Sequence, residues 1–273
     1  MIKMSKIIVK PNKEEDIKKI VKLDVDGIIL PLKDMCVGSS FFMTLDSIID
    51  LKIINKEKII LINKIMHNKD LELLKEILIK LKDSDIKKII FYDLAVYTLF
   101  KELDCNNIEL VIGQEHLNRS SNSNNFYNEL GINYSYITSD ITIDEIKEIR
   151  SNTNMKLLYT VYGRLPLFCS RRYLISNYLE YINKEKHNSN YYIKNRDDNL
   201  YISEEDNATL IYSDIVNLIN KIDELDFIDY LVLDFNNINE YKDIINKFKN
   251  KIKDGEEYYL GFYNTKTIYR VKK

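Results

Sequence analysis

The sequence predicts an α/β protein with a TIM-like (β/α)8 barrel and a small β-rich insertion between strands 7 and 8. Eight short apolar or β-branched runs alternate along the chain with segments of helical periodicity. The first seven runs begin about 20 to 31 residues apart, which suits a strand, a helix and two loops. The length of 273 residues also suits one barrel, since such barrels commonly take about 250 residues.

The expected barrel strands are short and strongly apolar. Residues 59–62 and 89–92 are continuous apolar runs instead of alternating ones, as expected when a parallel strand is covered on both faces. The eight predicted strands are Lys6–Val9, Gly27–Leu30, Lys58–Ile62, Lys88–Tyr92, Ile108–Ile112, Tyr134–Ile137, Lys156–Val161 and Tyr230–Leu233.

The segments between these runs carry the apolar stripe of amphipathic helices. The clearest stripe combines Leu71, Leu74, Leu78 and Leu81, and comparable stripes recur in the first and sixth helical segments. Residues with good N-cap side chains stand before three of the helices, namely Asn12, Thr44 and Asp70.

More than 70 residues separate the starts of the seventh and eighth predicted strands, so an insertion is expected there. Tyr191–Lys194, Leu200–Ser203 and Ala208–Ser213 have the pattern of short strands joined by turn-rich connections. We therefore expect a single domain over residues 1–273, with a β-rich insertion at about 183–213. An open doubly wound sheet shares the alternation, but no Gly-rich phosphate loop follows any strand.

Composition restricts the class of protein. The 40 basic and 42 acidic residues give a net charge of −2 and are evenly mixed, which gives no strong nucleic-acid signal. No apolar run approaches the roughly 18–20 residues of a membrane helix, and the first ten residues lack a signal-peptide pattern. With three cysteines and no CxxC motif, we expect a cytoplasmic protein with neither disulfides nor a cysteine zinc site.

In a (β/α)8 barrel the functional residues lie at the carboxyl ends of the strands. The carboxylates Asp93 and Glu115 and the imidazole of His116 follow the fourth and fifth predicted strands, and we predict them as catalytic residues that activate water. Loop capping is the alternative role for such residues. Other polar groups stand at strand ends without an assigned catalytic role, namely His67, Thr138, Ser139, Asp140 and Asp234.

The stretch from Tyr159 to Leu179 concentrates arginines near the seventh strand. Arg164, Arg171 and Arg172 are predicted to bring three guanidinium groups to one mouth, where they suit carboxylate or phosphate ligands, although rim salt bridges are the alternative. The full set of predicted substrate-binding residues is Asn63, Gln114, Tyr162, Arg164, Arg171 and Arg172.

Two cysteines follow predicted barrel strands. Cys36 and Cys169 are both placed to face the mouth, and the neighbouring arginines supply positive charge beside Cys169. The alternative for each is a small buried thiol.

Val161–Leu167 reads Val-Tyr-Gly-Arg-Leu-Pro-Leu, and Ser170–Leu179 reads Ser-Arg-Arg-Tyr-Leu-Ile-Ser-Asn-Tyr-Leu. These stretches resemble a strand ending in His-Gly and the Ser-x-Tyr-Leu segment that follows it in the collagenase-like peptidase family U32. Further similar stretches, in the family's order, are Asp26–Leu30, Ile60–Asn63, Ile90–Asp93, Val111–Gln114 and Gly261–Lys272.

The resemblance implies a TIM-like barrel with a β insertion and either of two activities. Some members are described as peptidases. Others support oxygen-independent hydroxylation of transfer RNA, ribosomal RNA or ubiquinone precursors, using an iron–sulfur cluster held by four cysteines, and some of these act as pairs of related subunits.

This sequence departs from the family at the cluster. The first two cluster cysteines would fall at Pro166 and Tyr173, and residues 183–195, where the other two would fall, contain no cysteine. Three cysteines cannot supply four thiolates, so we expect no such cluster within one chain, while a divalent metal is left open. Tyr162 also replaces the histidine of the family's His-Gly pair.

Three functions follow as hypotheses, and the sequence leaves open whether the chain is an enzyme. The first is a U32-type peptidase acting at the barrel mouth. The second is a cluster-free partner subunit of an RNA- or ubiquinone-modifying hydroxylation complex, paired with a related U32-type subunit. The third is a protein that binds a small anion. The expected partners are therefore a related subunit, a peptide or a small anionic ligand, and no membrane.

Overall fold

Eight parallel strands close into a barrel in the computed structural model, which describes residues 5–113, 118–187, 191–195, 198–205 and 208–265. The barrel order is β1-β2-β3-β4-β5-β6-β7-β11, and β11 closes the circle by pairing with both β1 and β7. This confirms the predicted TIM-like barrel. The barrel strands are β1 (Lys6–Lys10), β2 (Gly27–Pro31), β3 (Glu57–Ile62), β4 (Lys88–Phe91), β5 (Glu109–Ile112), β6 (Tyr134–Tyr136), β7 (Lys156–Ser170) and β11 (Tyr230–Asp234).

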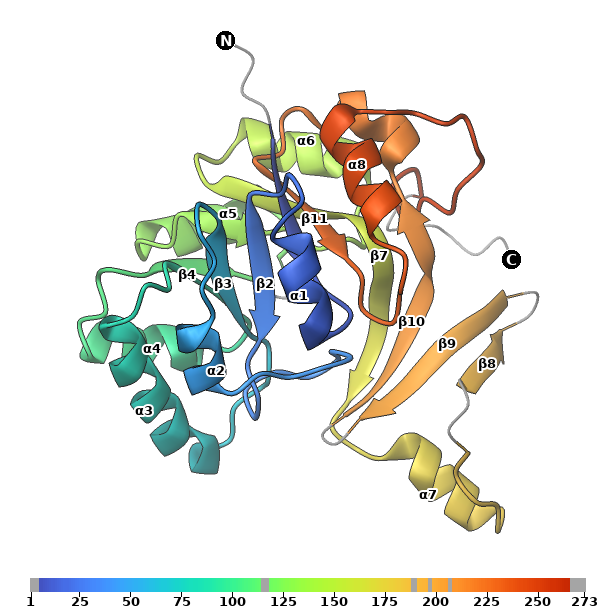
Figure 1. The fold of residues 1–273 in the computed structure, drawn as a ribbon, viewed down its shortest axis with the longest axis horizontal. Coiled ribbons are helices and arrows are strands. Elements are labelled where there is room, and N and C mark those ends of the chain that lie inside the picture. Colours follow the sequence, from blue (N-terminus) through green and yellow to red (C-terminus); the bar gives the residue numbers. More distant parts are fainter. Residues whose placement is uncertain (1–4, 114–117, 188–190, 196–197, 206–207, 266–273) are drawn as a thin grey trace.

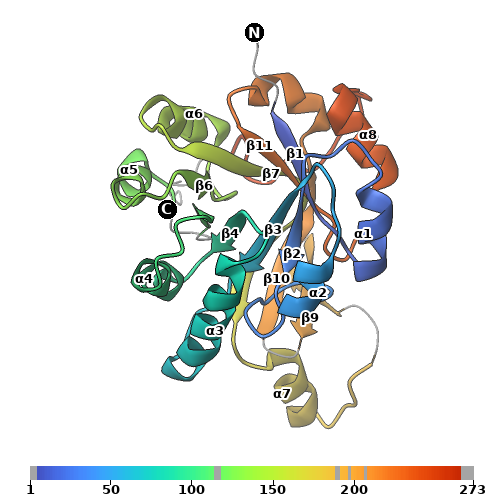
Figure 2. The same ribbon diagram turned by 60° about the vertical axis from the view of Figure 1, so that its left-hand side comes forward.

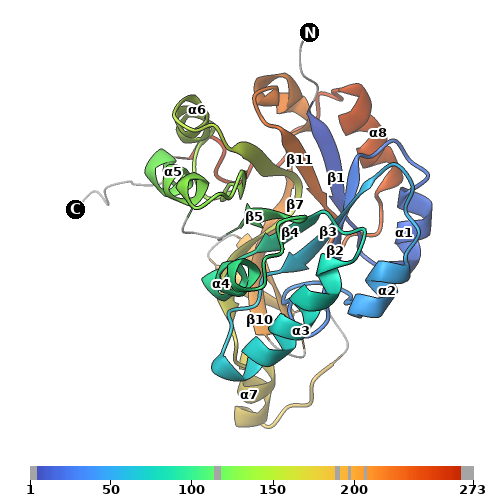
Figure 3. The ribbon, with the colours of Figure 1, turned by 90° about the vertical axis from the view of Figure 1, so that its left-hand side faces the viewer.

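Helices surround the barrel, as Figures 2 and 3 show. They bury the apolar stripes expected from the sequence, and Leu74, Leu78 and Leu81 of α3 are fully buried. The α-helices are α1 (Glu14–Ile20), α2 (Leu45–Asp50), α3 (Leu71–Lys82), α4 (Leu94–Glu102), α5 (Ser121–Glu129), α6 (Ile143–Ser151), α7 (Leu174–Tyr181) and α8 (Lys242–Asn250), with 3-10 segments η1 (Asn68–Asp70) and η2 (Ile219–Leu225).

The predicted helix starts are partly right. Thr44 caps α2 through a hydrogen bond from Ser47 N, whereas Lys13, not Asn12, occupies the N-cap position of α1. Asp70 precedes α3 without capping it through its side chain, because its carboxylate accepts a hydrogen bond from the backbone N–H of His67.

Successive residues of a barrel strand belong alternately to two apolar clusters. In β1, Ile8 belongs to the cluster that fills the barrel, while Ile7 and Val9 join the larger cluster between strands and helices. Both faces of the strand are thereby buried, which accounts for the continuous apolar runs of the sequence.

An antiparallel extension continues the sheet outside the barrel. The strand β7 runs nine residues beyond the predicted end at Val161 and pairs with β10 (Ala208–Asn217), followed by β9 (Asp198–Glu205) and β8 (Tyr191–Asn195). Figure 1 shows β7 and β10 leaving the barrel together, with α7 at the far end. The predicted insertion is therefore confirmed as strands bonded outside the barrel, while the assignment of residues 1–273 to a single domain stays a prediction.

Within the described residues, no helix is both long enough and apolar enough to cross a membrane.

Candidate ligand site at the barrel mouth

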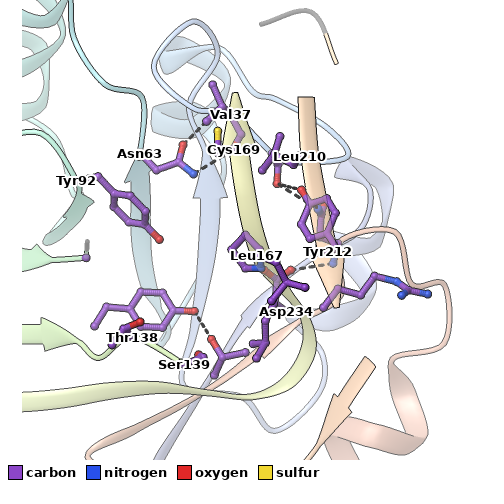
Figure 4. Close-up of a pocket in the computed structure, with 18 of the residues that line it drawn as sticks. Val37, Asn63, Tyr92, Thr138, Ser139, Leu167, Cys169, Leu210, Tyr212 and Asp234 are labelled. Carbon is purple, nitrogen blue, oxygen red and sulfur yellow. Dashed lines mark hydrogen bonds between the residues drawn. The ribbon is translucent and has the colours of Figure 1, made fainter. Parts of the chain in front are cut away.

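A cavity of about 760 Å³ lies at the carboxyl ends of the barrel strands, where β7 and β10 leave the barrel. Its apolar wall includes Ile29, Leu61 and Ile90 from inside the barrel. Figure 4 shows Asn63, Tyr92, Thr138 and Tyr212 lying around it from different strands. A concave, mostly apolar site with a few polar groups is typical of small-molecule binding.

A buried ion pair lies in one wall of the cavity. Lys10 ends β1 and Asp234 ends β11, and the two residues are direct partners in the sheet. The ammonium Nζ of Lys10 lies 3.3 Å from Oδ2 of Asp234, and the lysine side chain is only 9% exposed. Burial alone would lower the pKa of Lys10, but the negative charge of Asp234 outweighs this effect, so the net shift of the pKa is upward. Lys10 is therefore a charged ammonium group.

The loop after β2 crosses the mouth and is fixed by two asparagines. Asn63 accepts a hydrogen bond from Val37 N (2.7 Å) and donates one to Val37 O (3.0 Å). Asn236 donates to the carbonyl of Gly38 (3.1 Å) and accepts from Ser40 N (2.6 Å). The loop segment 36–40 is therefore held from β3 on one side and from the end of β11 on the other.

Gly38 permits this close approach. Its φ is +67°, and a Cβ atom at this position would lie 2.6 Å from Cδ2 of Leu210 on β10. A larger residue would have to push the loop away from the extension, so the sequence places glycine where the loop meets the sheet.

The opposite wall is built by the ends of β6 and β7. The hydroxyl groups of Tyr136 and Thr160 lie 2.7 Å apart, and Thr138 Oγ1 donates to Asp140 Oδ1 at 2.5 Å. Asp140 also forms an ion pair with Arg119. Of the described residues, the two carboxylates that line the cavity, Asp140 and Asp234, are thus already paired with cations.

Arg164 brings a guanidinium group without such a counter-charge. Nη1 donates to the carbonyl of Ser213 (3.0 Å), and the group stacks 5.2 Å from the ring centre of Tyr201. Among the described residues, no carboxylate lies within 4.0 Å of it. Gly163, with φ of +130°, allows β7 to pass this point, because a Cβ there would lie 2.4 Å from the carbonyl oxygen of Asp234. The arrangement favours an anionic group on the ligand.

The three thiols are dispersed. Burial raises the pKa of Cys36 to about 12, so it is a neutral thiol near Lys10. Cys169 lines the cavity, while Cys105 is buried under α3 and contacts the carbonyl of Leu78. Pro166 lies within β7 and Tyr173 at the N-cap of α7. The residues present do not fit the four-cysteine cluster of the U32 pattern.

Several predicted site residues lie away from the cavity. Asp93 is the N-cap of α4, and its carboxylate accepts hydrogen bonds from Ala95 N (2.9 Å) and Met66 N (2.8 Å). Tyr162 is buried against Phe235 and Phe248 on the helix side of the strand. Of the predicted catalytic and substrate-binding residues, Asn63 and Arg164 line the cavity within the described part of the chain.

The expected convergence of three arginines is wrong. Arg171 and Arg172 follow the distal end of β7 and do not line the cavity with Arg164, because β7 continues as a strand instead of turning back at Gly163. Gln114, Glu115 and His116 lie outside the described residues, so their predicted roles stay predictions.

Sequence reasoning missed Lys10, Tyr92 and Asn236 as parts of the mouth. Each stands at or just after the carboxyl end of a predicted strand. Their position at the carboxyl end of a strand, which led to the prediction of Asn63, could therefore have predicted these three residues as well.

Comparisons with known proteins agree with this architecture. A family model described as peptidase family U32 matches residues 42–233. The tRNA hydroxylation protein P2 of Bacillus subtilis (strain 168) is 29% identical over 173 residues, which are 60% of this chain and 56% of that protein. The solved structure of the U32 peptidase Mk0906 matches with a TM-score of 0.53 and 13% identity, covering 85% of this chain and 93% of that one. The structural match supports the fold.

Proposed function

This chain belongs to peptidase family U32, and on that basis we propose that it is a cluster-free partner subunit of an RNA-hydroxylating complex that binds a small anionic molecule at its barrel mouth. The similarity to a tRNA hydroxylation protein supports the first part, although the aligned stretch spans little more than half of that relative. The cytoplasmic location expected from the sequence is part of the proposal.

One observation carries the ligand class. Among the described residues, two cations and two carboxylates line the cavity, and Asp140 is paired with Arg119, which does not line it. Arg164 also lines the cavity and has no carboxylate within 4.0 Å among the described residues. A carboxylate or phosphate group on the ligand would complete the charge balance of this wall.

Peptidase activity is the second candidate, and the family's description favours it. Its support from the described residues is weaker, because a water-activating base needs a carboxylate or an imidazole that is able to take up a proton. Asp93 caps a helix, and Asp140 and Asp234 are ion-paired. Glu115 and His116 are left as the predicted base for this activity.

The test is deletion of the chain in its source organism, followed by mass spectrometry of the nucleosides of total RNA. We expect the loss of a nucleoside that carries one additional oxygen atom. Expression of the wild-type chain or of Lys75→Ala, an exposed residue of α3, restores the nucleoside, whereas Arg164→Ala does not. An unchanged nucleoside profile after deletion would contradict the proposed function, and cleavage of peptides by the purified chain that depends on Glu115 would support the peptidase instead.

A further inference from the structure

Exposed aromatic side chains concentrate on the extension. Of the seven exposed Phe and Tyr residues in the described part of the chain, five lie between positions 168 and 192. The two most exposed are Tyr178 (62%) and Tyr181 (84%) of α7. Because they are three residues apart on a helix, their rings lie on neighbouring positions of one face. Ile175 is the buried residue of α7.

Positive charge accompanies these rings. Arg171 and Arg172 precede α7 and Lys184 follows it, and all three are exposed. Across the described residues, none of the three has a carboxylate within ion-pair distance of 4.0 Å. Residues 168–194 contain five basic and two acidic residues, a net charge of +3, although the whole chain has a net charge of −2. The chain therefore concentrates positive charge where its aromatic rings are exposed.

A buried carboxylate fixes α7 to the extension. Glu204 of β9, whose side chain is 1% exposed, accepts hydrogen bonds from Ile175 N (2.8 Å) and Ser176 N (3.2 Å) at the start of the helix. It also accepts a bond from Thr209 Oγ1 (3.1 Å) on β10. The exposed tyrosines are therefore presented on an anchored helix, which Figure 1 shows projecting away from the barrel helices.

We propose that the α7 surface, formed by Arg171, Arg172, Tyr178, Tyr181 and Lys184, binds a single-stranded or looped segment of RNA. Bases stack on the two tyrosine rings, and the cations contact the phosphates. This inference rests on the proposed function, because it assigns to this subunit a contact with the RNA that the complex modifies.

The composition of the surface favours RNA over a protein partner. The core of a protein–protein interface is depleted of charged residues and rich in apolar area. On α7, a helix that the structure describes in full, the exposed large apolar side chains are tyrosines and none is aliphatic. Tyrosine rings flanked by unpaired cations instead match the stacking platform and phosphate contacts of single-strand binding.

Binding is measured by fluorescence anisotropy of a labelled oligouridine with the purified full chain, between about 50 and 200 mM salt. We expect Tyr178→Ala/Tyr181→Ala to weaken binding at least about fivefold without changing the salt dependence, as loss of stacking requires. Arg171→Ala/Arg172→Ala is expected to weaken binding and to flatten the slope of log affinity against log salt by about 0.7 per lost phosphate contact.

Two controls match these variants. Phe126→Ala removes an exposed ring on α5, and Lys69→Ala/Lys75→Ala removes two exposed charges, all outside the α7 surface. Equal losses in the controls, or absence of binding by the wild-type chain at low salt, would overturn the inference. It is also overturned if the α7 variants keep their RNA affinity but release a protein that co-purifies with the wild type. Nucleoside analysis after gene deletion measures hydroxylation directly and does not depend on the α7 surface. The proposed function can therefore hold even if the RNA-binding inference fails, and the two outcomes are distinguishable.

Discussion

Lys10 and Asp234 form an ion pair across the seam between β1 and β11, although 224 positions separate them in the sequence. The pair fixes the wall of the cavity, because Asp234 also accepts a hydrogen bond from Asn236 N and Asn236 holds Gly38. We expect Lys10→Met to destabilise the protein by roughly 3 kcal/mol, since it leaves a partly buried carboxylate unpaired. Urea denaturation at neutral pH measures this difference.

A second substitution isolates the pair itself. Asp234→Asn keeps the oxygen that accepts from Asn236 N, so the double variant Lys10→Met/Asp234→Asn should lose less stability than the two single variants together. Lys19→Met is the control, because Lys19 is an exposed cation 3.6 Å from Asp16 and its removal should cost less than about 0.5 kcal/mol. Equal effects of Lys10→Met and Lys19→Met would show that the buried pair does not stabilise the mouth.

Gly38 and Gly255 provide a matched test of the loop that crosses the mouth. Both have positive φ, +67° and +76°, but a Cβ on Gly255 meets nothing within 4 Å, whereas one on Gly38 meets Leu210 at 2.6 Å. We expect Gly255→Ala to cost about 1 kcal/mol for the backbone conformation alone. Gly38→Ala should cost roughly 1–3 kcal/mol more because of the added contact. Thermal unfolding of the two variants gives the comparison, and equal losses would place the loop farther from the extension.

The barrel strands were predictable because a strand that is buried on both faces requires apolar residues at consecutive positions, and the sequence shows such continuous runs. The outer half of β7 was not, because Gly163 and Pro166 are typical of a turn, and only the pairing with β10 shows that the strand continues. Asp93 illustrates a second limit. A carboxylate after a barrel strand is equally suited to catalysis and to capping the next helix. The carboxylate of Asp93 accepts hydrogen bonds from Ala95 N at the start of α4 and from Met66 N in the loop after β3.

Long-range pairing explains why the sequence did not indicate the burial of Lys10. A lysine at the end of an apolar run has the pattern of an exposed residue, and Lys10 is buried because its partner arrives from the far end of the chain. The mixed charge of the whole sequence likewise gave no nucleic-acid signal, because the basic excess of residues 168–194 is offset by acidic residues elsewhere.

Acidification is expected to release α7 from the extension. Burial alone raises the pKa of Glu204, but the hydrogen bonds from Ser176, Lys186 and Ile175 outweigh it and lower the pKa from 4.5 to about 2. A carboxylate with a lowered pKa contributes stability that is present above the unfolded value and is lost as the pH falls from about 4.5 towards 2. Hydrogen exchange of the α7 amides, relative to those of α6, should therefore accelerate over this range.

Glu204→Gln should produce the same acceleration at neutral pH, while Glu185→Gln, an exposed neighbour, should leave the exchange unchanged. If Glu204→Gln leaves the α7 amides as protected as in the wild type, the carboxylate does not anchor the helix.

The amino end of the barrel is closed by a second buried lysine. Nζ of Lys88 lies 2.8 Å from a carboxylate oxygen of Glu57 and 2.8 Å from one of Glu109, and its side chain is 7% exposed. Burial alone raises the pKa of both glutamates, but their hydrogen bonds to lysines lower it, and the net shift is downward. Their charged forms therefore stabilise the fold above the unfolded pKa, and this contribution is lost on acidification.

Lys88→Met removes the shared cation and leaves Glu109 without a cation at ion-pair distance among the described residues, so we expect the free energy of unfolding to fall by roughly 3 kcal/mol at pH 7. The difference from wild type should shrink near pH 4, because the glutamates of the variant take up protons more readily and its stability then depends less on their charge. Lys88→Met/Glu109→Gln should recover part of the loss at pH 7, since it removes the unpaired charge. Urea denaturation at the two pH values separates charge from packing: a difference that is the same at both would assign the role of Lys88 to its aliphatic stem.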